Sequence, residues 1–290
     1  MKAQSFTRAS APAAANEPVV LRENIGHIAV LTLNRPQARN SLSEAMLEAL
    51  SQELESLATE KRIRAVVVAA QGSAFSAGHD LKELTAHRAD ADGGRSYTRH
   101  IMERCSAVML AILRLPQPVI AAVEATATAA GCQLVATCDL AVASTSAKFC
   151  TPGVHIGLFC STPMVALSRN LTRKHALEML FTGDLISAED AHRVGLVNRV
   201  VEPGTARDEA LKLARKIAAE SAAAVKFGKE AFYRQLEMGI ADAYDHARRR
   251  GRHFGLRREA PADLGGSVMT ALVSCLRGRR RQRLRTVSHA

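Results

Sequence analysis

The sequence has 290 residues, of which 47% are hydrophobic and 23% charged, and its 18 glycines and 9 prolines leave it with an ordinary globular composition. This composition excludes a disordered chain, a collagen-like repeat and a small disulfide scaffold. No stretch approaches 18 consecutive apolar residues, so no membrane-spanning helix is expected. Tryptophan is absent and aromatic residues make up 4%, which argues against base stacking on single-stranded nucleic acid.

The formal net charge of +11 comes almost entirely from the end of the chain. Residues 248–290 contain 12 arginines and two acids, a net charge of +10. The first 247 residues contain 27 basic and 26 acidic side chains, a net charge of +1. The body of the protein is therefore nearly neutral, and a nucleic-acid-binding interpretation applies only to the final segment.

Short apolar strands alternate with amphipathic helices along the chain. Strands are predicted over residues 19–21, 28–33, 64–70, 118–123, 139–143 and 197–201. One helix is predicted to begin at the capping box Ser41-x-x-Glu44, a second to end before Pro116, and a third to begin at about Gly131. A short helix is predicted from Ser187 to Gly195, and further helices over residues 162–169, 173–182, 206–219 and 222–238. This alternation predicts an α/β fold.

The same patterns divide the chain into four parts. Residues 1–18 are expected to be a disordered leader, residues 19–200 the core, residues 201–247 a C-terminal helical region, and residues 248–290 an aberrant Arg-rich tail. The leader lacks the apolar stretch of a secretory signal. The expected location is therefore cytoplasmic, with a weak transit peptide and the mitochondrial matrix as the alternative.

Six cysteines show neither a CxxC pair nor a metal-type spacing with histidine; they are Cys105, Cys132, Cys138, Cys150, Cys160 and Cys275. Several lie in apolar surroundings, where a thiol behaves as a small core residue. We therefore predict reduced, structural cysteines in a reducing compartment and no metal site.

Two turns rich in small residues follow buried strands. The first is the segment 75–82 (FSAGHDLK) and the second is the segment 127–134 (ATAAGCQL). Each joins a strand to a helix through backbone with little side chain, so its amides are accessible to a ligand. If the two turns faced each other, they would supply two amide donors to one carbonyl oxygen, as in an oxyanion hole. The alternative is that the small residues serve only close packing.

Several separate motifs make the segment 19–247 resemble the crotonase (enoyl-CoA hydratase/isomerase) superfamily. These motifs are the two turns just described, the sequence Asn34-Arg35-Pro36-x-x-x-Asn40 and the sequence Phe181-Thr182-Gly183. More narrowly, the segments 127–144 and 148–167 resemble the enoyl-CoA hydratase domain-containing protein 3 subgroup. The resemblance implies a spiral of ββα units with a C-terminal α-helical trimerisation region. It also implies homotrimers or dimers of trimers, and a role in fatty-acid metabolism without a membrane or nucleic-acid partner.

The resemblance further implies an acyl-CoA thioester as substrate and no separate cofactor, because coenzyme A is part of the substrate. Its carbonyl would be held by the backbone amides of His79 and Ala130, with Lys82 near a CoA phosphate. The implied CoA-binding residues are Ala77, His79, Asp80, Leu81, Lys82 and Gly131.

The two catalytic positions of the family depart from its pattern. Active hydratases in this family resemble one another in having two glutamates as general acid and base, and the matching positions here are Gln133 and Gly153. Neither residue can transfer a proton near neutral pH. The sequence therefore predicts weak or absent hydration, and the alternatives are a non-catalytic acyl-CoA binder or regulator, or another thioester reaction at the same oxyanion hole.

Other side chains near these positions have simpler interpretations. His155 is a candidate base, but a structural or surface role is favoured, and the ring of His79 is expected to face solvent. Asp80 is expected to cap a helix rather than bind ribose or adenine. The cysteines near the site lack a neighbouring base, so a nucleophilic thiol is not expected.

The Arg-rich tail does not resemble the end of the family. Codons can be chosen for residues 252–264 that, read one nucleotide later, spell GISAFVEKRPPTW, a string that resembles the family's usual C-terminus. The hypothesis is that a frameshift, with a deletion, produced residues 248–290. Blocks of like charge such as residues 277–285 seldom fold, and a genuine nucleic-acid-binding arm is the alternative.

Overall fold

The computed structural model describes residues 17–255. Residues up to Arg234 belong to one compact unit, and a second unit begins at Gln235 and includes helix α10 (Ile240–Gly255). No helix among the described residues is long and apolar enough to cross a membrane. Most of the predicted leader and residues 256–290 of the Arg-rich tail lie outside the described residues.

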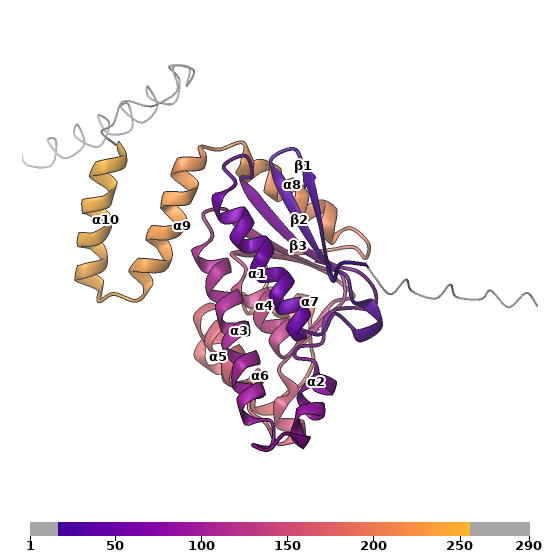
Figure 1. Cartoon of the computed structure of the whole chain (residues 1–290). Helices are drawn as coiled ribbons and strands as arrows, with labels where there is room; N and C mark the ends of the chain where they lie inside the picture. The colour runs from indigo at the N-terminus through magenta and orange to yellow at the C-terminus, as the bar shows by residue number, and fades with distance from the viewer. Residues whose placement is uncertain (1–16, 256–290) are drawn as a thin grey trace, which may run out of the picture. The chain divides into compact units, whose positions relative to one another are not determined.

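The first unit is built around a six-stranded sheet (Figure 1). Its strands lie in the order β1 (Val20–Ile25), β2 (Ile28–Leu33), β3 (Ala65–Ala70), β5 (Val119–Val123), β7 (Leu140–Ser144) and β10 (Arg199–Val201). The first two strands form an antiparallel hairpin, and every later pair is parallel. Parallel neighbours need long crossover connections, and the helices occupy these connections.

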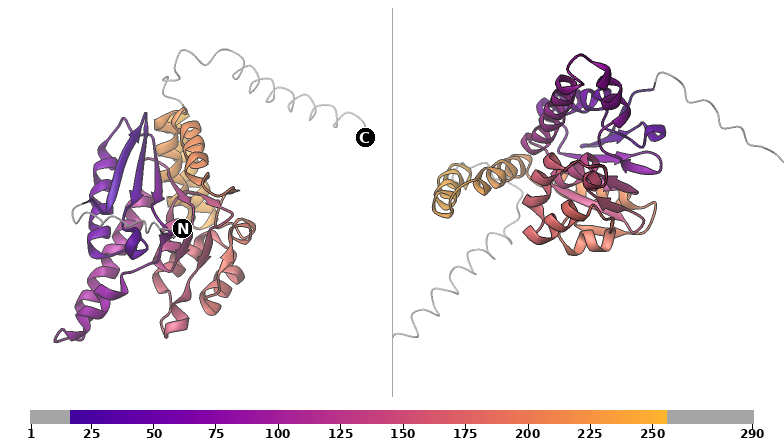
Figure 2. Two further views of the ribbon diagram at one scale, coloured as in Figure 1. Left: turned by 90° about the vertical axis from the view of Figure 1, so that its right-hand side faces the viewer. Right: turned by 90° about the horizontal axis from the view of Figure 1, so that it is seen from below.

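Alternate side chains of the central strands enter two different cores. One set, which includes Leu31 and Val68, packs against helices α1 (Glu44–Thr59) and α3 (Arg95–Arg114). The other set, which includes Val30 and Val67, packs under helix α8 (Ala206–Ala218), on the opposite face (Figure 2). Because both faces are covered, the strands are apolar at nearly every position, as the sequence pattern indicated.

Three strands of the large sheet are each followed by a short strand of a second sheet. Strand β4 (Ala74–Ser76) follows β3, β6 (Thr126–Thr128) follows β5, and β8 (Lys148–Cys150) follows β7. These short strands pair in parallel, and β9 (Ile186–Ser187) joins β8 antiparallel. The repeated ββα unit confirms the α/β spiral expected from the sequence. The short strands were not predicted.

The remaining helices follow the predicted positions closely. They are α4 (Ala130–Thr137), α5 (Ser161–Asn170), α6 (Arg173–Thr182), α7 (Ala188–Arg193) and α9 (Ala222–Leu236). No range was predicted for α2 (Leu81–Ala86), which begins after the expected cap Asp80, or for the 3-10 turns η1 (Pro36–Ala38), η2 (His87–Ala89) and η3 (Pro152–Ile156). One predicted cap is wrong: α1 is capped by Ser43, whose Oγ accepts from the Met46 amide at 3.2 Å, while the Ser41 hydroxyl donates to Asp80.

Helix α8 is part of the sheet's packing, although its sequence position fell in the predicted C-terminal helical region. Its buried stripe of small residues, with Leu211, lies directly on the large sheet. The carboxylate of Glu124 accepts from the amides of Gly204 (2.9 Å) and Ala206 (2.5 Å), so it satisfies the start of this helix. Helix α8 therefore belongs to the packing of the first unit.

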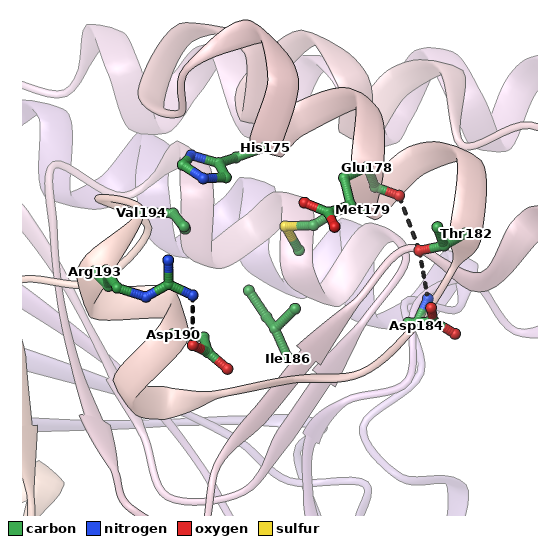
Figure 3. Close-up of a pocket in the computed structure, with 9 residues that line it drawn as sticks. All are labelled: His175, Glu178, Met179, Thr182, Asp184, Ile186, Asp190, Arg193 and Val194. Carbon is green, nitrogen blue, oxygen red and sulfur yellow. Dashed lines mark hydrogen bonds and ion pairs between the residues drawn. The ribbon is translucent and has the colours of Figure 1, made fainter.

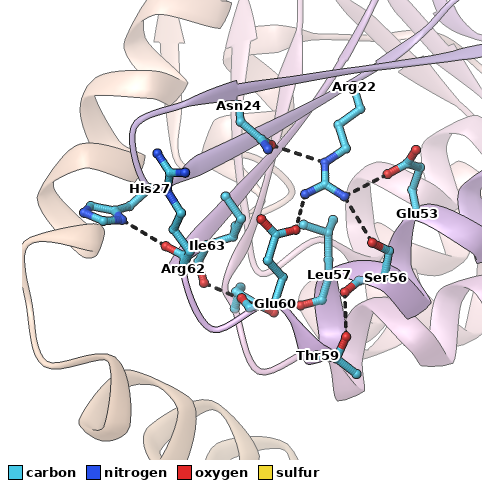
Figure 4. Close-up of polar contacts among 11 residues, drawn as sticks. Arg22, Asn24, His27, Glu53, Ser56, Leu57, Thr59, Glu60, Arg62 and Ile63 are labelled. Atoms are coloured by element: carbon cyan, nitrogen blue, oxygen red, sulfur yellow. Dashed lines mark hydrogen bonds and ion pairs between the residues drawn. The ribbon is translucent and has the colours of Figure 1, made fainter.

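The edge hairpin is fastened to helix α1 by Arg22 of strand β1 (Figure 4). Its guanidinium pairs with Glu60 and with Glu53 at 3.3 Å, and donates to Ser56 Oγ at 3.3 Å. Its Nε donates to Asn24 on the same strand at 3.2 Å. The network fixes how the hairpin lies on the helix, since several bonds share one rigid planar group.

Helix α9 is anchored by a buried ion pair within the first unit. The Nζ atom of Lys229 lies 2.6 Å from Asp139 Oδ2 and donates to the carbonyls of Ile112 (2.9 Å) and Gln117 (3.0 Å). The Tyr233 hydroxyl donates to Asp139 Oδ1 at 2.8 Å. Burial lowers the pKa of Lys229, and the Asp139 carboxylate opposes that shift. Each proton of the ammonium therefore has an acceptor.

Replacing Lys229 with Met is expected to lower the free energy of unfolding by about 3–5 kcal/mol, because Asp139 would stay buried without its counter-charge. Lys226 is exposed on the same helix, and Lys226→Met is the matched control, with an expected change within about 0.5 kcal/mol. Urea unfolding measures both variants. Equal stability of the two would contradict the anchoring role.

Candidate functional site

The three parallel short strands bring the predicted site segments to one edge of the small sheet. Strand β4 ends at Ser76, β6 at Thr128 and β8 at Cys150. Because β6 pairs with both neighbours in parallel, all three carboxyl ends lie at the same edge. The segments that carry His79, Ala130 and Gly153 leave from this edge. Ligand sites in α/β proteins form outside the carboxyl ends of parallel strands.

The two small-residue turns touch backbone to backbone. A Cβ atom placed on Gly131 would lie 2.3 Å from the Ser76 carbonyl oxygen. Gly78 has a φ of +87°, and a Cβ there would lie 2.9 Å from the Ala129 Cβ and 3.1 Å from the Ala130 nitrogen. Glycine is therefore required at both positions, because any larger residue would push the turns apart.

The amides of His79 and Ala130 donate to no carbonyl within the described part of the chain. Ala130 is the first residue of α4, where a helix leaves its amides without intrahelical partners. The preceding Ala129 has φ 50° and ψ −120°, a strained conformation for a residue with a side chain. Because the peptide is planar, the ψ angle of Ala129 sets the direction of the Ala130 N–H.

A buried asparagine supports the first turn and was missed in the sequence. The Asn40 side chain accepts from the Arg35 amide (2.8 Å) and donates to the carbonyls of Gln71 (2.7 Å) and Ala74 (2.8 Å). Its own carbonyl accepts from Ser76 Oγ at 2.8 Å. Arg35 and Asn40 belong to the motif noted in the sequence, so the motif was the available signal. Its role is to position the turn after β4.

Asp80 caps helix α2, as expected. Its carboxylate accepts from the amides of Lys82 (3.1 Å) and Glu83 (3.4 Å) and from Ser41 Oγ (2.9 Å), and it lies 3.3 Å from the Arg35 guanidinium. Burial alone would raise the pKa of Asp80, but these hydrogen bonds and the nearby charge hold it below its usual value. The side chain is therefore committed to the fold.

The positions around Asp80 that are predicted to bind CoA differ in exposure. Ala77 is half-buried, whereas Leu81 and Lys82 are exposed at the start of α2. Among the described residues Lys82 forms no ion pair. Its ammonium is available to an anionic group beside the two turns.

The ring of His79 does not face solvent, so that expectation is wrong. Both ring nitrogens are buried and form no hydrogen bond within the described residues. Burial lowers the pKa of His79, and the nearby Leu42 carbonyl opposes the shift without completing a hydrogen bond. The imidazole is therefore neutral near pH 7, because burial disfavours its charged form.

Positions 133 and 153, which are predicted to correspond to the family's two glutamates, differ in the space around them. Gln133 lies in the first turns of α4, is 5% exposed, and its Oε1 has no hydrogen-bond partner within the described residues. Gly153 lies in η3, where a Cβ would approach both the Cys160 sulfur and the Leu158 carbonyl oxygen to 2.9 Å. The loop after Gly153 therefore occupies space that a side chain would need.

His155 has a structural role, as favoured from the sequence. Its Nε2 lies 2.7 Å from the Thr182 carbonyl oxygen, to which it donates, and its ring lies against Gly183. Thr151 Oγ1 donates to the Met179 carbonyl at 2.9 Å. Both bonds tie η3 to α6.

The five cysteines that the structure describes are free and buried. Burial raises the pKa of Cys105 to about 12 and that of Cys150 to about 11. The pKa values of Cys132, Cys138 and Cys160 are also raised, chiefly by burial. These thiols stay protonated near neutral pH, so they are poor nucleophiles. Within residues 17–255 no cluster of side chains suits a metal ion.

A cavity of about 370 Å³ lies apart from the two turns, between helices α6 and α7 with Ile186 of β9 (Figure 3). Charged side chains from both helices line it, and Arg193 pairs with Asp190 at 2.7 Å. None of the predicted site residues contributes to its lining.

Comparisons with known proteins agree with this arrangement. The model of the enoyl-CoA hydratase/isomerase family matches residues 23–254. The rat protein named enoyl-CoA hydratase domain-containing protein 3, mitochondrial, is 48% identical over 214 residues, which is 74% of this chain and 70% of the relative. The short-chain-enoyl-CoA hydratase of Clostridium acetobutylicum is 33% identical over 229 residues, 77% of this chain and 84% of the relative.

Solved structures show the same likeness. An enoyl-CoA hydratase from Mycobacterium smegmatis superposes with a TM-score of 0.80 at 52% identity, covering 84% of this chain and 93% of that one. The human enoyl-CoA hydratase domain-containing protein 3 superposes with a TM-score of 0.78 at 44% identity, covering 82% and 93%.

Replacing Gly131 with Ala is expected to lower the free energy of unfolding by about 1–3 kcal/mol, because the new methyl group would overlap the Ser76 carbonyl. Gly228 of α9 has nothing within 4 Å of its Cβ position, and Gly228→Ala is expected to stabilise by about 0.5–1 kcal/mol. Urea unfolding compares the two. A neutral Gly131→Ala variant would show that the turns are not in contact.

The stability of the protein is expected to fall with pH below about 6.5 in part because of His79. The folded state lowers the pKa of His79, so in this range the unfolded chain binds a proton that the folded protein does not. Thermal unfolding at pH 7.5 and 5.5 measures the loss. His79→Phe should lose less stability than the parent between these pH values, and an equal loss would contradict the assignment.

Proposed function

Because this chain belongs to the enoyl-CoA hydratase/isomerase family, we propose that it binds an acyl-CoA thioester at the edge formed by β4 and β6. It hydrates enoyl-CoA weakly or not at all. The thioester carbonyl accepts hydrogen bonds from the amides of His79 and Ala130. No metal or separate cofactor takes part, since coenzyme A is part of the substrate.

One observation supports this proposal: at the same edge, two adjacent turns carry amides that donate to no carbonyl within the described residues. The contact between Gly131 and Ser76 holds the turns together, and the strained Ala129 fixes the direction of one N–H. Rigid donors of this kind stabilise the negative charge that develops on a thioester oxygen. The N-terminus of α4 adds a favourable dipole.

The neighbouring residues suit the remainder of a CoA ester. Ala77 is half-buried, Leu81 offers an exposed apolar side chain, and the ammonium of Lys82 can pair with a CoA phosphate. Gly131 is buried, and contributes by letting the two turns come together. Asp80 contributes by capping α2, and so acts through the backbone that it holds rather than through contact with the ligand.

The proposed weakness of hydration rests on four positions. Gln133 and Gly153 offer no titratable group, His155 donates to a backbone carbonyl, and the imidazole of His79 lacks a partner that would orient it. Losing a general acid or base typically costs about 10²–10⁴-fold in rate. Without a general acid or base, the site can only polarise the thioester carbonyl. This also supports the alternative of a non-catalytic acyl-CoA binder.

Assembly and location are parts of the same proposal. Large apolar side chains are exposed on and beside η3 and α6, among them Ile156, Leu158, Phe159, Phe181 and Leu185. Such exposure favours self-association, in line with the proposed homotrimer. The rat and human relatives are named as mitochondrial proteins, which supports the mitochondrial matrix over the cytoplasmic location first expected.

Calorimetry is expected to show that the protein binds butyryl-CoA. The fall in crotonyl-CoA absorbance is expected to show a hydration turnover rate far below about 10 s⁻¹.

The double variant Gln133→Glu, Gly153→Glu is expected to hydrate crotonyl-CoA faster than the parent, because it places a carboxylate at both positions. Adding Cys160→Ala should raise the rate further, because it removes one of the two close contacts at position 153.

Each outcome bears on a different part of the proposal. Failure of every CoA ester to bind would refute the site itself. Rapid hydration by the parent would refute the roles assigned to Gln133 and Gly153. No gain in either variant would mean that the acyl pocket differs in shape from that of a hydratase.

A further inference from the structure

The cavity between helices α6 and α7 is separate from the proposed thioester site (Figure 3). Its volume of about 370 Å³ lies within the range of small-molecule sites in proteins, about 300–1,000 Å³. None of its lining residues belongs to the turns that carry His79 and Ala130. A ligand of this cavity therefore goes beyond the proposed function.

The walls of the cavity are fixed by hydrogen bonds from neighbouring elements. On α6, the carbonyl of Met179 accepts from Thr151 Oγ1 at 2.9 Å. The carbonyl of Thr182, one turn further on, accepts from His155 Nε2 at 2.7 Å. Strand β9, which carries Ile186, pairs with β8. These bonds hold the walls without any ligand, and a preformed cavity lowers the ordering cost of binding.

Two carboxylates at the end of α6 lack a counter-charge. The Thr182 hydroxyl donates to the Glu178 carbonyl at 2.9 Å and accepts from the Asp184 amide at 3.2 Å, so these residues lie close together (Figure 3). Neither the Glu178 nor the Asp184 carboxylate forms a hydrogen bond or an ion pair within the described part of the chain. Both are therefore available to a ligand.

The other charged groups leave the cavity negative. Arg193 lies 2.7 Å from Asp190 on α7, so these two charges compensate each other. His175 is the remaining titratable group of the lining, and its Nδ1 lies 3.0 Å from Thr172 Oγ1. The lining thus contains three carboxylates against one guanidinium and at most one imidazolium. A cavity with this charge attracts cations and repels anions.

The middle of the cavity is apolar. Met179 is buried and Ile186 and Val194 are half-buried, and all three line the cavity. In Figure 3, Met179 and Ile186 lie between the Asp190–Arg193 pair and Asp184. A methionine side chain adapts to the shape of what it contacts, and covering this surface with a hydrocarbon chain is favourable. No cluster of described side chains suits a metal ion, so the lining favours an organic cation.

We propose that this cavity binds a small aliphatic ammonium ion, with its nitrogen at the carboxylates of Glu178 and Asp184. Its hydrocarbon chain lies on Met179, Ile186 and Val194. An ammonium group has three donors and a full positive charge, so it can bond to both carboxylates at once. The inference does not rest on the proposed function, because no residue of the thioester site takes part.

Calorimetric titration of the full chain with n-pentylammonium, ethylammonium and valerate tests the proposal. Pentylammonium is expected to bind at least about 10-fold more tightly than ethylammonium, because its longer chain covers more apolar surface. Valerate has a chain of the same carbon number but the opposite charge, and it is expected not to bind. The affinity for pentylammonium should fall as the salt concentration rises.

Variants of the two free carboxylates locate the site. The double variant Glu178→Gln, Asp184→Asn keeps the shape of both side chains and is expected to bind pentylammonium about 10-fold more weakly. The matched control Glu55→Gln, Glu202→Gln removes the same charge at exposed positions outside the cavity and should keep the parental affinity. Because Glu178 and Asp184 are exposed, both double variants are expected to unfold at the parental temperature.

The outcomes decide each part of the inference. Failure of pentylammonium to bind, or equal binding of valerate, overturns it. Equal affinity for the two ammonium ions overturns the role of the apolar lining. Equal weakening in the double variant and its control means diffuse attraction, and overturns the site. Should the double variant fail to fold, the single variant Asp184→Asn serves in its place, with an expected weakening of about 3-fold.

Discussion

The direct contact between the backbone of Gly131 and the carbonyl of Ser76 is the constraint on which the candidate site depends. This contact leaves no room for a side chain between the two turns. The amides of His79 and Ala130, which lie on these turns, are therefore held at the same edge of the small sheet. The amide of the strained Ala129 donates to the Cys150 carbonyl oxygen at 2.9 Å, and this hydrogen bond holds the residue in place. Strain of this kind persists only where surrounding structure over-determines it.

Buried polar groups in the supporting structure have hydrogen-bond partners, whereas those at the candidate site do not have them among the described residues. Asn40, Asp80 and the Lys229–Asp139 pair are buried with good partners, and each fixes one element to another. Gln133 Oε1 and both ring nitrogens of His79, near the edge where the turns meet, are buried without hydrogen-bond partners in the part of the chain that the structure describes. Paired groups stabilise the fold, whereas unpaired ones cost free energy until a ligand satisfies them. This contrast between supporting and unpaired groups is what one expects of a binding site.

Much of the fold could be predicted from local patterns. The large strands and the long helices follow from apolar runs and from the 3.6-residue period, both of which depend on neighbours in the sequence. The strands of the small sheet were missed, because three residues such as Ala74–Ser76 are too short to carry a period. The cap of α1 was misplaced by two residues, because Ser41 and Ser43 look alike until Asp80 takes the hydroxyl of Ser41.

The sequence by itself determined the family and the absence of carboxylates at positions 133 and 153, because residue identity limits proton transfer whatever the fold. It also located the two turns, since only small residues permit their backbone approach. Only the tertiary structure decided that the ring of His79 is buried, that His155 donates to Thr182, and that the loop closes over Gly153. Those facts arise from contacts between segments far apart in the chain, which no local pattern records.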